Sequence, residues 1–372
     1  MVLISLVLVF LCLINLILRK SKSFFLITII FMWLLATFTY VNADETVYQG
    51  RYENPELWAN NTEYLFLVLI KICKSFNLTF IEYKGIIFAI ILILISSTIW
   101  KLSSFPNVVL IMYMFYPFLM HISQIRNALA TSVFIFGYRY LINDTSKKLH
   151  FKRLNLSIND LKYVFCIIIA SLIHTAALIW IIILIIKKIN LKLDIIISVI
   201  LNIVIYFSSS ISFIGNKLSS LSGAAGRMDA YFSANYQTTS FRHYGSIIPC
   251  ILVMVIFVVT YIILWKVTKD KTAIMGLKLN IIMSICISMI LKYSSELYRP
   301  FEGTLVLNYI LLLNLIPKEQ FFRVRTKISY FMSEIFIGIA VFSFMYFLVG
   351  GNIMTVLAPV FYNNYLFSIF NG

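Results

Sequence analysis

Long apolar runs follow one another along almost the whole chain, and short basic segments separate them. Each run is about 14 to 22 residues long, and the longer ones suit helices that cross the roughly 30 Å hydrocarbon core of a bilayer. Only 12% of the 372 residues are charged, against about a quarter in a soluble domain. Because a helix satisfies its own backbone hydrogen bonds, the runs predict an all-α, polytopic integral membrane protein. We predict about 12 transmembrane helices, including short broken helices, in a single multi-pass membrane domain over residues 1–372.

The chain carries a net charge of +16, and most of its basic residues lie in the short segments between apolar runs. Lys and Arg in that position mark the cytoplasmic side of a membrane protein and contact anionic lipids. We therefore predict membrane lipids as partners and no nucleic acid. The five cysteines are scattered through apolar runs, with no CxxC pair and no Cys/His cluster. They are interpreted as small buried hydrophobes, and neither a metal site nor another cofactor is expected.

The charges around the first apolar run orient the chain. Residues 2–18 come before Arg19 and Lys20, whereas a signal peptide has its basic residues first. This order predicts an external N-terminus. The predicted cytoplasmic loops are about residues 19–23, 143–157, 187–193, 266–271 and 318–327. The predicted external loops are about residues 42–61, 208–246 and 292–303.

Residues 158–186 form an apolar segment with basic loops on both sides and His174 in its middle. Since both ends should be cytoplasmic, we predict two short helices that meet near His174 at the outer face. Ser157 and Asp160 form a capping box, which predicts that the first helix begins near Ile158. Short helices at membrane depth are tolerated where they line a cavity.

Residues 63–80 are also unusual, because they are apolar but contain Lys71 and Lys74. This pattern indicates an amphipathic helix on the outer surface. In an alternative topology this segment and residues 158–186 are each a single full span. The basic loop at 147–153 is then external, against the usual distribution of positive charge.

One arginine lies between two apolar runs. Arg126 follows residues 107–120 and precedes residues 128–141, within the sequence QIRNALA at 124–130. At the centre of a bilayer an arginine costs about 2.5–3.5 kcal/mol. We therefore expect Arg126 at the mouth of a polar cavity. A snorkelling arginine at a helix end is the simpler alternative.

The predicted outer face gathers side chains that suit a phosphate- and sugar-bearing ligand. Arginine binds phosphate bidentately, and histidine can accept a proton near neutral pH. We predict as catalytic residues Arg126, His174 and Arg299, and as substrate-binding residues Gln124, Arg51, Arg227, Arg242, His243, Tyr231 and Tyr236. Nearby acidic residues are Asp44, Glu45, Glu53, Asp229, Glu296 and Glu302. Taken singly, the arginines and tyrosines have simpler roles as interfacial residues, and His174 has one as a structural histidine.

Short motifs follow one another in order through the first half of the chain. They are Asp44 with Tyr48, EYLF at 63–66, Tyr116-Pro117, QIRNALA at 124–130 and ASLIHTAAL at 170–178. In this order and spacing they resemble the EpsG family of Wzy-like polysaccharide polymerases. In the second half, Tyr231-Phe232 and Arg299-Pro300-Phe301 stand where that family keeps aromatics and an arginine. Asn127 departs from the glutamine that family members often have after the arginine.

The resemblance implies a bacterial inner-membrane glycosyltransferase with GT-C-like architecture and an active site facing outside. It would polymerise undecaprenyl-pyrophosphate-linked oligosaccharide repeat units into an exopolysaccharide, capsule or O-antigen on the outer leaflet. The donor's lipid pyrophosphate would be the leaving group, so neither a nucleotide sugar nor a metal is needed. Arginines would neutralise that pyrophosphate, and a histidine or carboxylate would accept the proton of the acceptor hydroxyl. A chain-length regulator and a flippase of the same pathway are candidate partners.

A lipid-linked oligosaccharide flippase or polysaccharide exporter is the competing prediction, because it also needs an arginine-rich cavity. The predicted arginines cluster at one face rather than along a central passage, which favours an enzyme at that face. A membrane acyltransferase would use His174 but would not need the outer arginines. The chain has no Walker A motif, GxGxxG, HExxH or nucleophile elbow, which disfavours ATPase, redox and metalloprotease activities.

Overall fold

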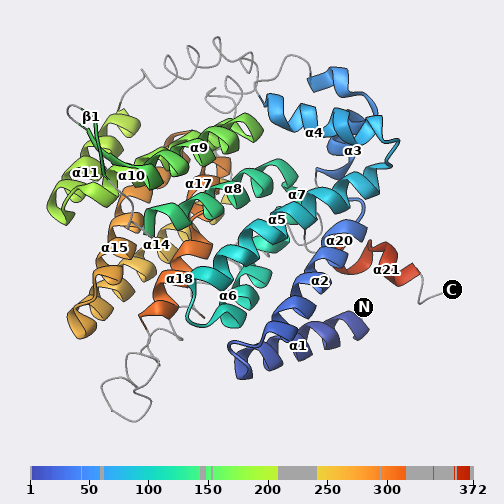
Figure 1. Ribbon diagram of the computed structural model, residues 1–372, viewed down its shortest axis with the longest axis horizontal. Helices are drawn as coiled ribbons and strands as arrows, with labels where there is room; N and C mark the ends of the chain where they lie inside the picture. Colours follow the sequence, from blue (N-terminus) through green and yellow to red (C-terminus); the bar gives the residue numbers. More distant parts are fainter. Residues whose placement is uncertain are drawn as a thin grey trace. The chain divides into compact units, whose positions relative to one another are not determined.

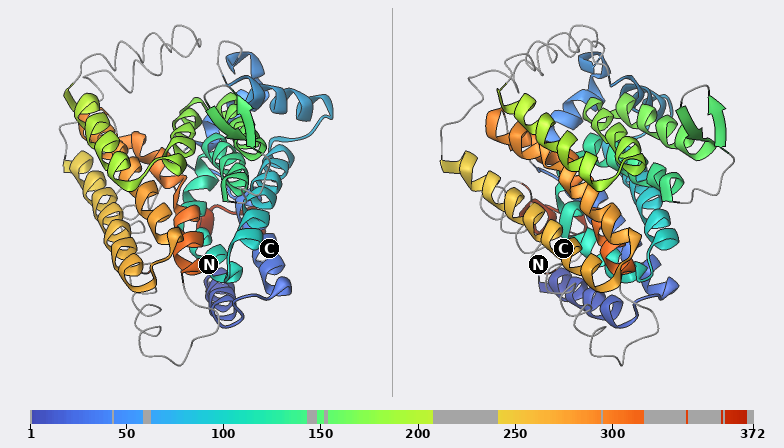
Figure 2. Two further views of the ribbon diagram at one scale, coloured as in Figure 1. Left: turned by 60° about the vertical axis from the view of Figure 1, so that its left-hand side comes forward. Right: turned by 90° about the vertical axis from the view of Figure 1, so that its left-hand side faces the viewer.

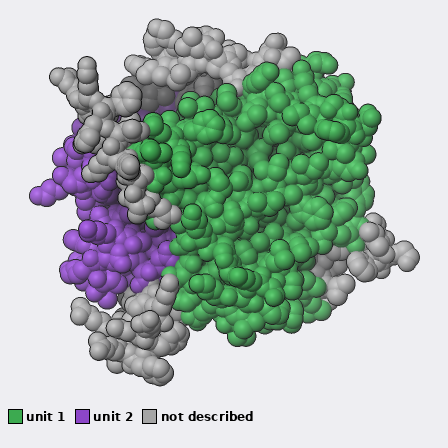
Figure 3. Space-filling view, viewed as in Figure 1, with its two compact units in different colours: residues 1–59, 63–184, 352–372 green, residues 60–62, 185–351 purple. Residues whose placement is uncertain are grey.

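A computed structural model describes the chain in two compact units (Figure 3). Met1–Ala59, Glu63–Leu184 and Asn352–Gly372 form the first unit, and Asn60–Thr62 with Ile185–Gly351 form the second. The described residues are 2–42, 44–58, 63–142, 148–151, 154–207, 241–293, 295–315, 338, 356 and 358–368. Nearly all of them are helical (Figure 1), as the apolar runs predict.

The helices of the first unit come from both ends of the chain. They are α1 (Val2–Ile17), α2 (Lys22–Phe38), α3 (Glu45–Glu53), η1 (Pro55–Trp58), α4 (Tyr64–Ser75), α5 (Phe80–Leu102), α6 (Pro106–Tyr113), η2 (Met114–Phe118), α7 (Leu119–Ser123), α8 (Ile125–Ile142), α9 (Ile158–Ile173), η3 (Thr175–Ile181), α20 (Ala358–Tyr362) and α21 (Tyr365–Ser368). In this unit α8 packs between α5 and α9.

The second unit contains the remaining described helices. They are α11 (Leu191–Phe207), α14 (Phe241–Thr268), α15 (Lys271–Met283), α16 (Ile285–Lys292), η5 (Ser295–Tyr298), α17 (Arg299–Glu302) and α18 (Leu305–Asn314). Helix α10 (Ile182–Lys188) runs across the boundary between the units.

Four helical segments within the described residues are long and apolar enough to cross a membrane. They are Phe80–Leu102, Pro106–Ser123, Cys250–Thr268 and Lys271–Lys292. Two shorter apolar helices, Leu6–Ile17 and Lys22–Phe38, accompany them. The protein is therefore a membrane protein, while the count of about 12 spans and the sidedness of the loops stay predictions.

The predicted break at His174 is confirmed. Ser157 and Asp160 form a reciprocal capping box, and α9 begins at Ile158 as expected. The helix ends at Ile173 because His174 has an extended backbone, with φ −150° and ψ 116°. A short 3-10 helix, η3, follows.

The chain between residues 63 and 102 differs from the prediction of one amphipathic helix over 63–80. Helix α4 ends at Ser75, and a separate helix, α5, begins at Phe80. The reason is a second capping box that the sequence interpretation missed: Thr79 accepts from the backbone of Glu82, whose carboxylate accepts from the Thr79 backbone. Helix α4 is amphipathic, with Lys71 and Lys74 on its exposed side.

Two predicted loops contain regular structure. The predicted external loop at 42–61 contains helices α3 and η1. The predicted cytoplasmic loop at 143–157 contains an antiparallel hairpin, β1 (Lys148–Phe151) with β2 (Leu154–Ser157), drawn as green arrows in Figure 2. Outside this hairpin the described elements are helices, as predicted.

The predicted outward span at 107–120 is interrupted. Tyr116 has an extended backbone, with φ −158° and ψ 131°, and the Tyr116–Pro117 peptide bond is cis. Helix α7 ends at Ser123, and α8 begins two residues later at Ile125. Helix α8 thus begins three residues before the predicted apolar run at 128–141, and Arg126 lies in its first turn.

Buried amides link the helices of each unit. In the first, the Asn15 amide donates to Thr28 Oγ1 (2.8 Å) and accepts from Asn107 (2.7 Å). In the second, the Asn280 amide donates to the Asn308 carbonyl oxygen (2.7 Å). Such bonds hold helices together where apolar packing alone gives little specificity. All five cysteines are buried and unpaired, as the sequence predicts.

Candidate functional site

The candidate site is built around the carboxylate of Glu63. Its backbone carbonyl accepts from the N–H groups of Phe66 (3.1 Å) and Leu67 (3.3 Å), which begins α4. Its side chain is only 7% exposed and contacts Arg126 and His174. A carboxylate at a helix N-terminus is stabilised by the helix dipole, which lowers the cost of burying it there.

Arg126 makes the first contact. Its Nη1 group forms an ion pair with Glu63 Oε2. Its Nε lies 3.4 Å from the hydroxyl of Tyr48, and its guanidinium carbon lies 5.8 Å from the centre of the Tyr48 ring. The side chain is 17% exposed, so it is not an arginine extended into solvent. The first turn of α8 thus presents Arg126 to α3 and α4, which supports the predicted polar site over a snorkelling arginine.

His174 makes the second contact. Its Nδ1 lies 2.6 Å from Glu63 Oε1, and its side chain is 17% exposed. The extended backbone at the end of α9 places the ring beside the start of α4, although 111 residues separate the two positions. When Nδ1 carries the proton and donates it to Glu63, the neutral ring has its lone pair on Nε2.

The three side chains form a cluster whose chemistry follows from their connections. One carboxylate uses its two oxygens for two partners, which fixes its own orientation and that of each partner. A carboxylate that accepts from Nδ1 sets the histidine tautomer and stabilises the imidazolium that forms when Nε2 takes a proton. A guanidinium has five N–H donors, so it can serve this carboxylate and a phosphate together. The cluster can therefore combine proton acceptance with phosphate binding.

Two of the predicted substrate-binding residues are close in sequence to residues of the cluster. Arg51 is on α3, one turn after Tyr48, and is partly exposed. Gln124 is 6% exposed between α7 and α8, where its side-chain carbonyl accepts from Asn127 at 3.1 Å. That bond links the junction of α7 and α8 to the first turn of α8, which is a structural role. Ligand binding by either residue stays a prediction.

The remaining predicted residues belong to the second unit. Arg299 is half-buried at the first position of α17. Arg242 and His243 lie in the first turn of α14, and their side chains are outside the described part of the chain. Arg227, Tyr231 and Tyr236 lie outside the described residues altogether. The structure thus brings together Arg126 and His174, and the other predicted contributions to this site stay predictions.

The acidic partner differs from the predicted candidates. Asp44, Glu45 and Glu53 were expected to accompany the outer arginines, but the carboxylate that binds Arg126 and His174 belongs to Glu63. Tyr48 is the second residue that the chemical interpretation missed. Both stand within the motifs that carry the family resemblance, which was the available signal.

Within the described residues, no group of three or more His, Cys, Asp or Glu side chains is arranged to hold a metal ion. The cluster contains one carboxylate and one imidazole, and its third member is an arginine, which does not coordinate metals. These side chains are of the types that suit proton transfer and anion binding.

Apolar helices of membrane-spanning length, combined with a largely buried Glu–Arg–His cluster, define a helical membrane protein with an internal polar site. The model of the EpsG family matches residues 22–367, nearly the whole chain. The chain belongs to the EpsG family, which is a family of Wzy-like polymerases. No curated protein and no solved structure matches the chain significantly.

Proposed function

We propose that this protein is a Wzy-like membrane glycosyltransferase. It joins undecaprenyl-pyrophosphate-linked oligosaccharide repeat units into a surface polysaccharide on the outer leaflet of the bacterial cytoplasmic membrane. Family membership supports polysaccharide polymerisation in general. The specific observation that supports catalysis is the bridge from Glu63 to both Arg126 and His174.

The reaction needs one bond made and one bond broken. A hydroxyl oxygen of the acceptor repeat unit attacks the anomeric carbon of the donor. The bond between that carbon and the pyrophosphate oxygen breaks, and the pyrophosphate leaves with its lipid. The acceptor hydroxyl loses its proton, and negative charge develops on the departing phosphate.

His174 is the residue we assign to the proton. Its Nε2 accepts the hydroxyl proton while Nδ1 donates to Glu63 at 2.6 Å. The carboxylate stabilises the imidazolium and holds the ring in one orientation, as in other carboxylate–histidine pairs. A positioned base of this kind contributes about 10²–10⁴-fold in rate.

Arg126 is the residue we assign to the departing pyrophosphate. Glu63 and Tyr48 orient its guanidinium from two sides, so little reorganisation is needed when phosphate charge develops. The planar fork of arginine matches two phosphate oxygens, which a lysine ammonium cannot do. Arg299 and the residues predicted to bind sugar stay candidates for the same reaction.

Deletion of the gene in its host, followed by sizing of the surface polysaccharide, tests the proposal. A polymerase defect leaves single repeat units on the cell surface, and the wild-type gene restores long chains. A flippase defect instead leaves lipid-linked repeat units inside the cell. Unchanged chain length after deletion, or internal accumulation, would contradict polymerisation.

A further inference from the structure

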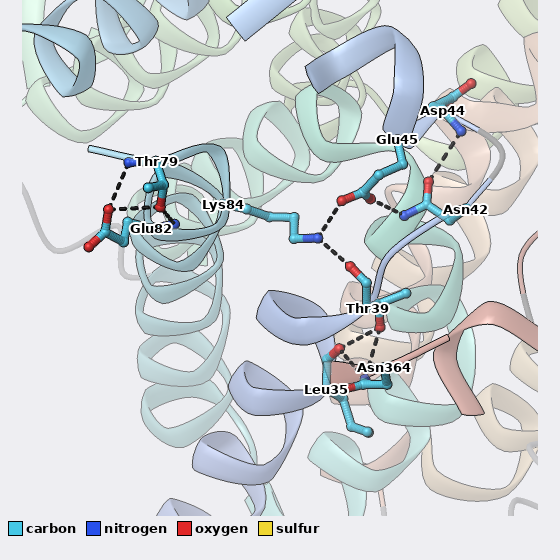
Figure 4. Close-up of polar contacts among 9 residues, drawn as sticks. All are labelled: Leu35, Thr39, Asn42, Asp44, Glu45, Thr79, Glu82, Lys84 and Asn364. Carbon is cyan, nitrogen blue, oxygen red and sulfur yellow. Dashed lines mark hydrogen bonds and ion pairs between the residues drawn. The ribbon is translucent and has the colours of Figure 1, made fainter. Parts of the chain in front are cut away.

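A second charged cluster in the first unit contains Lys84 and Glu45 (Figure 4). Lys84, on the first turns of α5, is 1% exposed and lies 2.5 Å from Glu45 Oε1. Its Nζ also donates to the backbone carbonyl of Thr39. The other oxygen of Glu45 accepts from the Asn42 amide at 2.5 Å. A lysine and a glutamate are rarely buried unless paired, and here both are paired and hydrogen-bonded.

The carbonyl that Lys84 binds belongs to a segment held by the C-terminal part of the chain. The Asn364 amide donates to Leu35 O (3.1 Å) and Thr39 Oγ1 (3.2 Å) at the end of α2. The Tyr40 N–H donates to Asn363 O at 2.7 Å. Figure 4 shows Asn364 and Lys84 approaching Thr39 from different elements. The ammonium of Lys84 therefore lies against a segment that is itself fixed.

Glu45 is the first residue of α3, and its position determines what it controls. Glu45, Tyr48 and Tyr52 are spaced three and four residues apart, so they share one face of the helix. All three are buried, at 5%, 7% and 4% exposure. Tyr52 is held at the far end of this stripe, where its hydroxyl donates to Leu78 O at 2.6 Å. At the first residue of α3, the ion pair with Lys84 fixes Glu45.

Tyr48 lies between these two fixed points, and it is the α3 residue that contacts Arg126. An apolar pair would bury α3 without fixing its rotation or its position along its own axis, whereas an ion pair with a 2.5 Å contact is directional. Replacement of a buried ion pair by apolar residues is often neutral for stability. Folding alone therefore gives little reason for this pair.

We propose that the Lys84–Glu45 pair is a positioning device that fixes α3, and through Tyr48 the guanidinium of Arg126, in the geometry that the reaction needs. This inference rests on the proposed function of the Glu63 cluster. The hydrogen bonds of Lys84 and Glu45 go to each other, Thr39 and Asn42, so the pair acts on Arg126 through another residue. A displacement of about 1 Å in such a site can lower the rate about 100-fold.

The test compares three variants in the deletion host at matched membrane levels: Lys84→Met, Glu45→Gln, and the two combined. The combined variant leaves no unpaired buried charge, so it should accumulate normally even if the single variants do not. We expect it to lower the ratio of long chains to single repeat units about 10- to 100-fold. Lys74→Met is the matched control, because Lys74 donates to Glu53 O (2.7 Å) at the other end of α3 from an exposed position. The control should polymerise normally.

Two further readouts separate positioning from a general loss of structure. Amide hydrogen exchange in α3 should be faster in the combined variant and unchanged in Lys74→Met. Tyr48→Leu removes the contact with Arg126 and should lower polymerisation by itself. Added to Tyr48→Leu, the combined Lys84→Met and Glu45→Gln change should lower it by less than about twofold further, because both changes act through one contact.

Each result has one interpretation. Wild-type chain length and unchanged α3 exchange in the combined variant would overturn the positioning role, as would multiplicative losses when Tyr48→Leu is added to the combined variant. Both conclusions require that Arg126→Lys and His174→Gln lose activity in the same host. If those two variants also polymerise normally, the assignment of the Glu63 cluster fails, and the positioning role fails with it.

Discussion

Glu63→Gln is the substitution that addresses the candidate site most directly. The carboxylate accepts from Arg126 with one oxygen and from His174 with the other. A carboxamide has one acceptor oxygen and one NH₂ group, so it can accept from only one of the two groups and faces the other with a donor. If the oxygen stays with Arg126, the NH₂ group can pair with His174 Nδ1 only in the tautomer that carries its proton on Nε2, and that tautomer cannot accept the substrate's proton there. In either arrangement the guanidinium loses the negative charge of its partner. The substitution changes no volume, so packing alone cannot explain an effect.

The magnitude follows from burial. Removal of one partner from a buried ion pair costs about 3–5 kcal/mol. Arg126 and His174 are each 17% exposed, so water can partly replace the carboxylate, and we expect about 2–3 kcal/mol. The loss of the group that orients the base should lower polymerisation by about 10²–10⁴-fold, well beyond the effect of reduced stability.

The assay measures protein level in membranes, the thermal unfolding temperature in detergent and polysaccharide chain length in the deletion host. Glu53→Gln is the matched control, because Glu53 is exposed and its carboxylate accepts a hydrogen bond from the neutral Gln49 amide (3.0 Å). The control should be unchanged in all three. A Glu63→Gln protein with normal unfolding temperature and full-length chains would refute the reasoning, since the bridge would then contribute neither stability nor catalysis.

Three other predictions concern the same chain. Arg126→Lys keeps the charge but loses the planar fork, so chain length should fall sharply at normal expression; full activity would contradict phosphate binding by the fork. His174→Gln can still donate to Glu63 but cannot carry a proton, so it should fold and lose about 10²–10⁴-fold in polymerisation, whereas a tolerated Gln and a poorly expressed Ala would indicate a structural histidine. In intact spheroplasts, an impermeant thiol reagent should label a cysteine at Ser222 but not one at Ser146, because the basic loop should stay cytoplasmic; the reverse pattern would overturn the topology.

Much of the local structure could be predicted from the chain alone. The low charge and the apolar runs establish a helical membrane protein, because a bilayer leaves the backbone few other ways to satisfy its hydrogen bonds. The capping box at Ser157 and the break at His174 are correct for the same kind of reason. They depend on groups within a few residues of one another, and such groups meet wherever the segment lies in the fold.

Two predictions of local structure were wrong. In one a capping signal was overlooked, and in the other burial against other segments outweighed the polar local sequence. The start of α5 at Phe80 depends on Thr79 and Glu82, a capping box that hydropathy alone does not reveal. The helix in the predicted external loop forms because Glu45, Tyr48 and Tyr52 bury one face of α3. That burial depends on a partner surface supplied by other segments, so the isolated sequence, which is mostly polar there, indicates a loop.

The partners of the charged residues are what the tertiary structure decided. The sequence by itself determined that Arg126 and His174 lie at helix ends, where polar groups can meet. It offered several acidic residues of equal charge, and nothing local distinguished Glu63 from Glu45. Packing brought Glu63 next to Arg126 and His174, which lie 63 and 111 positions further along the chain. It brought Glu45 next to Lys84, which lies 39 positions further along. Charge and polarity determine that a buried cation needs an anion, but which anion it meets depends on how the helices pack.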